Sequence, residues 1–490
     1  MSEKIIVGSQ NFSGGLVTVK PAHLLEEGQT PSCQNVDFSE SVGRLTKRKG
    51  YSKFMNANQG SSYQTVGLHQ YIQDDGTQFL LAAVNDDVYS IATASTWTSI
   101  HTDASNNGKR VRFANFRLTS GATQASAIFV GEELTTQKWS GSGSSSNLLG
   151  TPPSNARYIT VHRNKVWIAC HGIGNTPPYK SRINYSASLN AEDWTTASDA
   201  GHFDIDPGDG DEITGICSIG ASLLVFKKWA TYIIRGDTAT TFKVSKISAN
   251  IGCVAPDSIV RCDTFAIFLS NQGVYAATDT GVALLSYNIK PTIDALSDTV
   301  KAAAVACRLR TQYWLSYDSD ADGKNDEVLY LDFVFGIWGK YTNKKIRCAL
   351  TRLDGTLLTG SSATDEVHLH DDTDNDDGSA INMIWDTPDY DGGKWECQKQ
   401  AHDIIVGLGP ISGKNLTVAH LLNGIVQGTT ITKSLTPVST EDKIFLKQRH
   451  LPDTSYSPYI RFRFSNNETS ARLIMYGYSL VLNVLERANG

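Results

Sequence analysis

Two neighbouring stretches of this chain, residues 211–234 and 257–276, place the strongest limit on how it can fold. The first contains Leu-Leu-Val-Phe at 223–226, then two lysines, then Tyr-Ile-Ile at 232–234. Short runs rich in Val, Ile, Phe and Tyr between turn residues are typical of β-strands. The second stretch repeats this strand–turn–strand pattern around Gly273. Units this small cannot bury their apolar faces alone, so we expect them to pack on one another.

Similar units recur through most of the chain. Their hairpin turns are expected near residues 86, 123, 164, 220, 272, 322 and 355. This is a step of roughly 30–55 residues, and four-stranded propeller blades repeat about every 40–50 residues. The pattern predicts an all-β fold, with a degenerate β-propeller of about seven blades over residues 59–390. No WD40 or kelch signature repeats, so an irregular set of β-sandwiches is the alternative.

The two ends of the chain do not follow this pattern. Residues 1–58 are expected to form an N-terminal segment with a short helix at 22–28 and a short strand at 33–38. An acidic, turn-rich break precedes the C-terminal part. Beyond it the strands are longer, and Arg-Phe-Arg-Phe at 461–464 alternates as a half-buried antiparallel strand does. Residues 391–490 are therefore predicted to form a C-terminal β-sandwich domain.

Composition limits the classes of protein that fit. The formal net charge is −6, which argues against a chain that coats nucleic acid as a whole. No window is apolar over the length of a membrane span, and the N-terminus lacks the apolar core of a signal peptide. The 8 cysteines contain no Cys-x-x-Cys pair, so we expect free buried thiols rather than disulfides or a zinc site.

One acidic loop has the spacing of a metal site. Asp318, Asp320 and Asp322 alternate, and a glycine stands at the sixth place, as at the start of a calcium-binding loop. Asp326, at the ninth place, could add a ligand, but Leu329 stands where a bidentate Glu would complete the loop. An acidic hairpin turn explains the same residues more simply. A structural Ca²⁺ is the one ion that this sequence suggests, and no other cofactor is expected.

Catalytic motifs are not found in the sequence. It contains no Gly-x-Ser-x-Gly, no His-Glu-x-x-His and no P-loop. One carboxylate cluster could supply the acid and base of a glycoside hydrolase, although its Pro-Gly-Asp-Gly-Asp run is also an ordinary turn. The cluster comprises Asp204, Asp206, Asp209, Asp211 and Glu212. We therefore predict that the protein is not an enzyme. A basic stretch at 43–50 contacts an acidic neighbour or phosphate, or is a solvated turn.

Several short motifs together resemble the tail nozzle or tail-hub proteins of short-tailed bacteriophages, also called tail tubular protein B or tail stabilisation proteins. The first motif is Asn-Phe-Ser-Gly-Gly-Leu at 11–16. The others lie at 34–38, 45–50, 184–186, 193–194, 223–227, 251–259 and 269–275. The likeness covers most of residues 8–290 and is weaker after 340.

The resemblance implies a structural virion protein of the viral tail, assembled in the host cytoplasm. Such proteins form a hexameric ring below the portal and the head-to-tail adaptor proteins, with propeller domains around a channel for DNA ejection. The ring helps to retain and release the genome and contacts phage DNA transiently. Tail fibres, tailspikes or a tail needle attach nearby, and residues 1–58 would pack on the propeller or on the adaptor. The alternative is a carbohydrate-binding or glycan-degrading β-propeller that acts on host surface polysaccharide.

Overall fold

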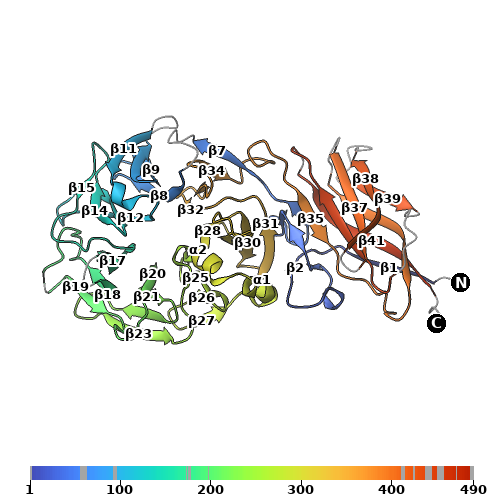
Figure 1. Cartoon of the computed structure of the whole chain (residues 1–490), viewed down its shortest axis with the longest axis horizontal. Helices are drawn as coiled ribbons and strands as arrows, with labels where there is room; N and C mark the ends of the chain where they lie inside the picture. Colours follow the sequence, from blue (N-terminus) through green and yellow to red (C-terminus); the bar gives the residue numbers. More distant parts are fainter. Residues whose placement is uncertain are drawn as a thin grey trace.

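The chain folds as a ring of β-sheets with a β-sandwich beside it (Figure 1). The computed structural model describes residues 3–55, 63–91, 97–172, 174, 178–196, 198–409, 414–422, 425–435, 444–449, 457–470 and 472–485. Within these residues the prediction of an all-β fold with a seven-bladed propeller is confirmed. Only two short α-helices occur in this part of the chain, α1 (Lys290–Asp294) and α2 (Asp298–Ala303), between the fifth and sixth blades.

Seven antiparallel four-stranded sheets form the propeller, each numbered here from its inner strand outwards. The first four blades comprise β8 (Thr65–Ile72), β9 (Gln78–Val84), β10 (Asp87–Ile91) and β11 (Trp97–Thr102); β12 (Val111–Arg117), β13 (Ala125–Gly131), β14 (Leu134–Trp139) and β15 (Ser146–Asn147); β16 (Tyr158–His162), β17 (Lys165–His171), β18 (Tyr179–Tyr185) and β19 (Gly201–Asp204); and β20 (Ile213–Ile219), β21 (Ser222–Lys227), β22 (Thr231–Arg235) and β23 (Lys243–Ser248).

The last three blades continue the ring. They comprise β24 (Val260–Cys262), β25 (Phe265–Ser270), β26 (Gly273–Ala277) and β27 (Val282–Leu284); β28 (Val305–Leu309), β29 (Gln312–Tyr317), β30 (Glu327–Asp332) and β31 (Ile337–Tyr341); and β32 (Cys348–Thr351), β33 (Leu357–Gly360), β34 (Val367–His370) and β7 (Tyr51–Met55).

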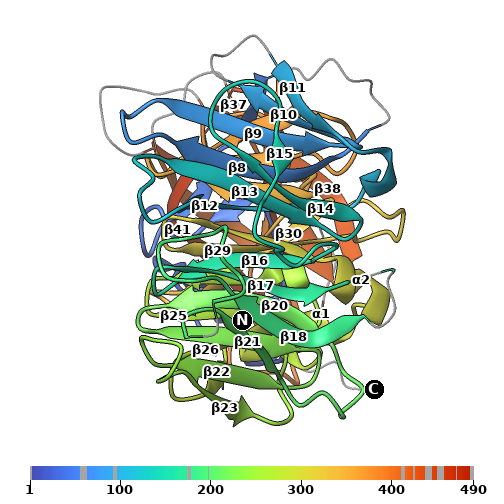
Figure 2. The ribbon, with the colours of Figure 1, turned by 90° about the vertical axis from the view of Figure 1, so that its left-hand side faces the viewer.

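The blades are held together by hydrophobic cores between their faces. Each inner strand contacts the inner strands of both neighbouring blades, from β8 around to β32 and back to β8. Figure 2, which views the propeller from the side away from the sandwich, shows the sheets layered on one another. A middle strand such as β21, whose residues are all buried, is covered on both faces. The units therefore bury in a circle the apolar faces that they cannot bury alone.

A strand from the other end of the sequence closes the ring. The outermost strand of the seventh blade is β7, which pairs antiparallel with β34. The chain thus completes the last blade with a strand that precedes the first. Tyr51, at the start of β7, stacks on His368 of β34 with ring centroids 4.4 Å apart. Ring closure therefore depends on this pairing between the N-terminal segment and the last blade.

The sandwich consists of two sheets that are built from both ends of the chain. One sheet has the order β39–β36–β41–β6–β5, and β1 also pairs with β41; the other has the order β38–β37–β40–β35–β4. Their strands are β1 (Glu3–Ser9), β4 (Cys33–Gln34), β5 (Val36–Asp37), β6 (Leu45–Lys47), β35 (Met383–Asp386), β36 (Lys399–Leu408), β37 (Lys414–Leu422), β38 (Ile425–Leu435), β39 (Ile444–Arg449), β40 (Arg461–Asn466) and β41 (Ile474–Val484).

The N-terminal segment is shared between the two bodies. We expected residues 1–58 as a segment of its own; in the structure it supplies β7 to the propeller and four strands to the sandwich. The expected helix at 22–28 is a 3₁₀ turn, Ala22–Leu24. The sandwich also begins earlier than residue 391, because β35 already belongs to it. The remaining short elements are β2 (Gly15–Leu16) and β3 (Gln29–Thr30), which pair parallel, and three further 3₁₀ turns: Ala104–Asn106, Pro256–Ser258 and Tyr287–Ile289.

The junction between propeller and sandwich is continuous hydrophobic core. One cluster of buried residues runs from the fifth and sixth blades into both sheets of the sandwich. The Tyr330 hydroxyl donates to the carbonyl of Val36 at 2.7 Å, which ties the sixth blade to β5. Gly15 lies so close to β31 that a Cβ would come within 2.7 Å of the Trp338 carbonyl oxygen, and its φ is +61°. The two bodies therefore pack as one unit rather than as linked domains.

We predict that Phe12→Ala lowers the free energy of unfolding by about 3–5 kcal/mol. Phe12 is fully buried, and its ring meets Trp385 edge-on with centroids 5.1 Å apart and lies 6.1 Å from Tyr478. These partners lie on opposite sheets of the sandwich, so truncation opens a cavity between them. Denaturant unfolding followed by circular dichroism measures the loss.

The matched control is Phe335→Ala. The Phe335 side chain is 52% exposed at the turn between β30 and β31, so its loss is expected to change stability by less than about 0.5 kcal/mol. Equal effects of the two substitutions would contradict the junction core described above.

Candidate functional site

A cavity at the centre of the propeller is the candidate site. Residues of all seven inner strands line it, and its volume is about 380 Å³. A second hollow of about 780 Å³ forms its mouth, on the face where the inner strands begin. These volumes are those of pockets for small ligands. The mouth is lined by charged residues that precede the inner strands, and by residues of α2.

The centre of the mouth is a carboxylate held by two arginines. Asp257, just before β24, accepts from Arg110 Nε at 2.8 Å and from Arg112 Nη2 at 2.6 Å. Burial alone would raise the pKa of the Asp257 carboxyl, but the charges of Arg110 and Arg112 lower it to about 2. Asp257 is therefore ionised at neutral pH.

Further arginines surround this group. Arg157, just before β16, pairs with Glu132 at 2.7 Å and with Glu212 at 2.8 Å. Arg347, just before β32, lines the mouth as well, and its buried Nε has no hydrogen-bond partner. Burial lowers the pKa of Arg347, and the charge of Arg110 lowers it further. The mouth therefore concentrates positive charge in a partly desolvated space.

One inner strand is distorted where it reaches the mouth. The pairing of β20 with β21 shifts register between Ile213 and Gly215, which leaves Thr214 in a β-bulge. Bulges re-aim side chains and are common beside binding sites. Thr214 is 7% exposed and lines the mouth, and its buried hydroxyl has no hydrogen-bond partner. A ligand oxygen could therefore use this hydroxyl.

The carboxylate cluster predicted as an acid–base candidate is spread out and paired. Arg182 holds Asp204 with two bonds of 2.7 and 2.8 Å, Lys246 holds Asp206 at 2.6 Å, and Lys227 holds Asp209 at 2.7 Å. Asp211 instead accepts from the backbone N–H of Trp229 at 3.1 Å, and Glu212 pairs with Arg157. Of the five, only Glu212 lines the mouth.

The protonation of this cluster does not suit acid catalysis. The bond from Arg182 lowers the pKa of Asp204, and the bond from Lys246 lowers that of Asp206. Burial acts against ionisation of Asp209, but the bond and the charge of Lys227 and the backbone N–H of Asp211 together outweigh it, so the pKa is lowered there too. A general acid needs a carboxyl whose pKa is raised towards neutrality. These three aspartates are instead held ionised.

Three of the four aspartates predicted as calcium ligands lie close together in the structure. One carboxylate oxygen from each of Asp318, Asp320 and Asp322 lies within 4.8 Å of the others. Asp326 stands apart from this group, because its two oxygens accept from the backbone N–H and the hydroxyl of Ser319 at 2.9 and 2.8 Å. Asp318 accepts from the N–H groups of Ala321 and Gly323, both at 2.8 Å, as in a tight turn. Bound Ca²⁺ stays a prediction.

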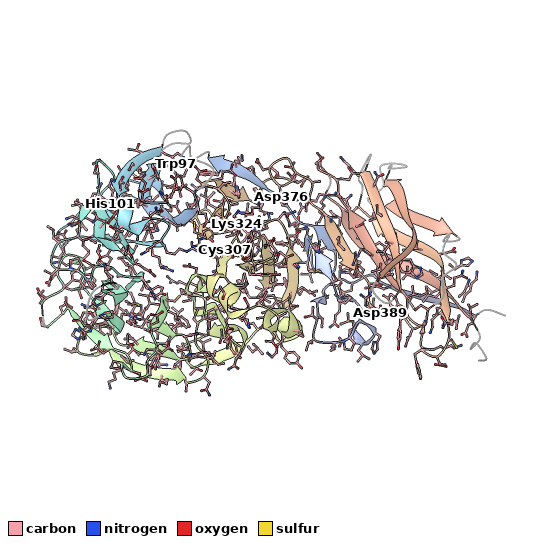
Figure 3. All side chains as sticks on the ribbon, viewed as in Figure 1. Trp97, His101, Cys307, Lys324, Asp376 and Asp389 are labelled. Atoms are coloured by element: carbon pink, nitrogen blue, oxygen red, sulfur yellow. The ribbon has the colours of Figure 1, made fainter. Side chains whose placement is uncertain are left out.

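A buried charge network lies at the junction, where Figure 3 labels Asp376. Arg48 holds Asp376 with bonds of 2.8 and 2.6 Å, and both side chains are almost fully buried. The fully buried Lys344 lies 3.6 Å from the same carboxylate and 3.3 Å from His370 Nδ1. The basic stretch at 43–50 thus places Arg48 on an acidic neighbour of the same chain, one of the alternatives considered above.

Burial sets the protonation of this network. It lowers the pKa of Lys344 to about 7, and the neighbouring Arg48 charge lowers it as well. Burial also lowers the pKa of His370 well below its ordinary value, so this imidazole is neutral. Its Nδ1 then accepts from Lys344, while its Nε2 donates to Thr359 at 2.7 Å. Lys344 is therefore a buried group that changes charge near neutral pH.

Sequence reasoning missed the arginines of the mouth. The motif at 251–259 includes Asp257, but its partners lie in blades far apart in the sequence. A signal was present: Arg110, Arg157, Glu212 and Arg347 each stand immediately before the apolar run of an inner strand. In a propeller these positions meet at one face of the central cavity.

The eight cysteines are free, and seven are buried.

Comparison with known proteins gives structural likenesses only. No protein-family model and no curated protein matches this chain. The WD40 domain of Pan2 from Neurospora crassa is 9% identical, with 67% of this chain and 96% of that chain covered and a TM-score of 0.40. YCF48 bound to D1 peptide is 10% identical, with 69% and 97% covered and a TM-score of 0.37.

A third solved structure is an exo-β-1,3-galactanase from Phanerochaete chrysosporium with β-1,3-galactotriose. It is 10% identical, with 71% of this chain and 99% of that chain covered and a TM-score of 0.27. At these values the likenesses carry no argument about function. Among the described residues, no helix has the length and apolar character that crossing a membrane requires.

We predict that Lys344 makes stability rise with pH above about 7. The unfolded chain keeps this lysine protonated up to about 10.5 and so binds more protons than the folded chain between the two pKa values. The contribution is a slope of about 1.4 kcal/mol per pH unit. Lys344→Met removes it, and denaturant unfolding between about pH 7 and 8.5, below the ordinary pKa of the thiols, measures the difference.

Lys345→Met is the control, because Lys345 is the exposed neighbour of Lys344. It is expected to keep the wild-type slope. If Lys344→Met keeps the same slope as wild type, the folded-state charge of Lys344 does not change in this range.

Proposed function

We propose that this protein is a structural component of the tail of a short-tailed phage. In this proposal several copies, six by the resemblance, form a ring below the portal and adaptor proteins and continue the channel through which DNA leaves. The observation that carries the proposal is the position of the motifs that resemble tail nozzle proteins. Those in the first 50 residues coincide with the joint between propeller and sandwich.

Three of these motifs meet at the joint. Phe12 of the first motif fills the space between the sandwich sheets. Asn35 of the second is fully buried with φ +56°, and its amide donates to Thr342 Oγ1 at 2.8 Å and to the Asn382 carbonyl at 2.7 Å. Arg48 of the third donates to Asn35 Oδ1 at 2.7 Å. The motifs therefore encode how the two bodies are fixed, which a ring-forming subunit requires.

The sandwich offers edges for assembly. In the sheets formed by the described residues, β38 and β39 each pair on one side only. Both lie on the part of the sandwich away from the propeller (Figure 1). An unpaired strand edge is a template for pairing with another chain. Contacts between neighbouring copies along these edges are consistent with a ring.

The passage for DNA would lie between subunits. The cavity within the propeller is of small-molecule size and is lined by side chains of every blade, so a duplex does not fit there. The chain carries a net charge of −6, and a wall of low positive charge lets DNA slide because few phosphates are neutralised. The proposal therefore places the channel on the axis of the ring.

The alternative is a glycan-degrading or carbohydrate-binding propeller. Three of its five candidate carboxylates, Asp204, Asp206 and Asp209, are held ionised in ion pairs, which disfavours their use as a protonated acid. Binding of a glycan without cleavage stays a prediction, since the exposed side chain of Trp229 could stack on a sugar ring.

We predict that the purified protein assembles into closed rings. Sedimentation over a concentration series is expected to show a shift from monomer to one defined oligomer, and electron micrographs are expected to show rings with a central opening. Addition of the adaptor ring from the same virion should move this shift to lower concentration, because a partner that binds the assembled form more tightly than the monomer favours assembly.

A monomer at every concentration, with and without the adaptor, would count against the ring. Cleavage of host surface polysaccharide by the wild type, lost in Asp209→Asn and retained in Asp237→Asn, would favour the alternative. Asp237 is the matched control because it is an exposed, ion-paired aspartate outside the cluster.

A further inference from the structure

The mouth of the central cavity contains more positive than negative charge. Six cationic side chains line it, against four acidic ones. The cations are Lys109, Arg110, Arg112, Arg157, Lys228 and Arg347; the acids are Glu132, Glu212, Asp257 and Asp298. Since the inner strands converge here, these charges come from blades that are distant in sequence. The excess attracts anions into a concave space with walls of low dielectric constant.

Among the described residues, one arginine of the mouth has no carboxylate at ion-pair distance. Arg110 and Arg112 share Asp257, and Arg157 is occupied by Glu132 and Glu212. Within the described part of the chain, no carboxylate lies within ion-pair distance of Arg347. Its Nε is buried without an acceptor, which costs free energy unless a ligand supplies one.

A second unused donor belongs to another residue that lines the same space. The Thr214 hydroxyl is buried by the bulge in β20 and has no partner. Lys228 contributes a further positive charge to the lining. Beside it, Trp229 is 49% exposed, with the Lys228 ammonium 5.1 Å from its ring centroid. The mouth thus combines unsatisfied donors with charged side chains in a concave space, as ligand sites do.

We infer that this mouth binds an oxyanion group, a carboxylate or a phosphate, with Arg347 and Thr214 as its donors. The planar guanidinium matches both groups, because each presents two oxygens at the spacing of its N–H donors. Asp257 already shows how the neighbouring guanidiniums Arg110 and Arg112 hold a carboxylate of the chain itself. The ligand supplies a second anionic group to the mouth, and it binds without making or breaking a covalent bond.

Titration calorimetry at constant ionic strength tests this inference with two probes. Sodium phosphate represents the phosphate group, sodium glutarate represents the carboxylate, and sodium chloride controls for non-specific screening. At least one probe is expected to bind the wild type. Arg347→Gln is expected to weaken that binding at least tenfold, which corresponds to about 1.4 kcal/mol. The probe that binds more tightly identifies the chemical source.

Arg352→Gln is the matched control. Arg352 follows the same strand, β32, at its other end, and pairs with Asp354 at 3.1 Å on the opposite face of the propeller. It is expected to bind the probes as the wild type does. If Arg347→Gln fails to fold by circular dichroism, Thr214→Val tests the same site, and its binding is expected to be at least threefold weaker.

Two outcomes would overturn the inference. One is that neither probe binds the wild type beyond the chloride control. The other is that the folded Arg347→Gln and Thr214→Val variants bind as tightly as the wild type, which would place the anion elsewhere. Neither outcome depends on whether the protein forms a ring, so the proposed tail function stands or falls separately.

Discussion

The ring of sheets closes where its first and last blades meet, and the rest of the molecule depends on how this closure is made. The join is the antiparallel pairing of β7 with β34, which brings residue 51 beside residue 370. Each pair of neighbouring blades shares a hydrophobic core, so loss of this one pairing would expose an apolar face at the last blade. Bringing the two ends of this long segment together costs loop-closure entropy once. In return, the hydrophobic cores between all neighbouring blades can form.

The N-terminal segment reinforces this join with charge. Arg48 lies three residues before β7. Its Nη1 and Nη2 donate to the two carboxylate oxygens of Asp376, which follows the strand β34. A buried ion pair adds little to stability compared with an apolar pair of equal volume, but it penalises any arrangement that separates the partners. Arg48 and Asp376 therefore specify where the N-terminal segment crosses the ring. Lys344, beside them, adds a charge that burial opposes.

The repeat could be predicted from sequence because the first three strands of a blade are apolar. The outer strands β15 and β27 could not, since they are only two or three residues long and mostly exposed. The uneven spacing of the turns has a simple cause: the turn near 86 joins the second and third strands of its blade, whereas the turn near 164 joins the first and second. The short strand predicted at 33–38 is divided in the structure into β4 and β5, of two residues each, which belong to different sheets.

The candidate site was hidden for a different reason. Its residues are single charges, each placed before an inner strand, and they become a site only when the ring closes. Arg347 belongs to the seventh blade and Thr214 to the fourth. An anion held by both residues would therefore connect two separate blades of the ring. By linkage, such a ligand would stabilise the closed ring, because an open ring cannot present both donors at once. The same closure that makes the propeller rigid therefore also brings the residues of the mouth together.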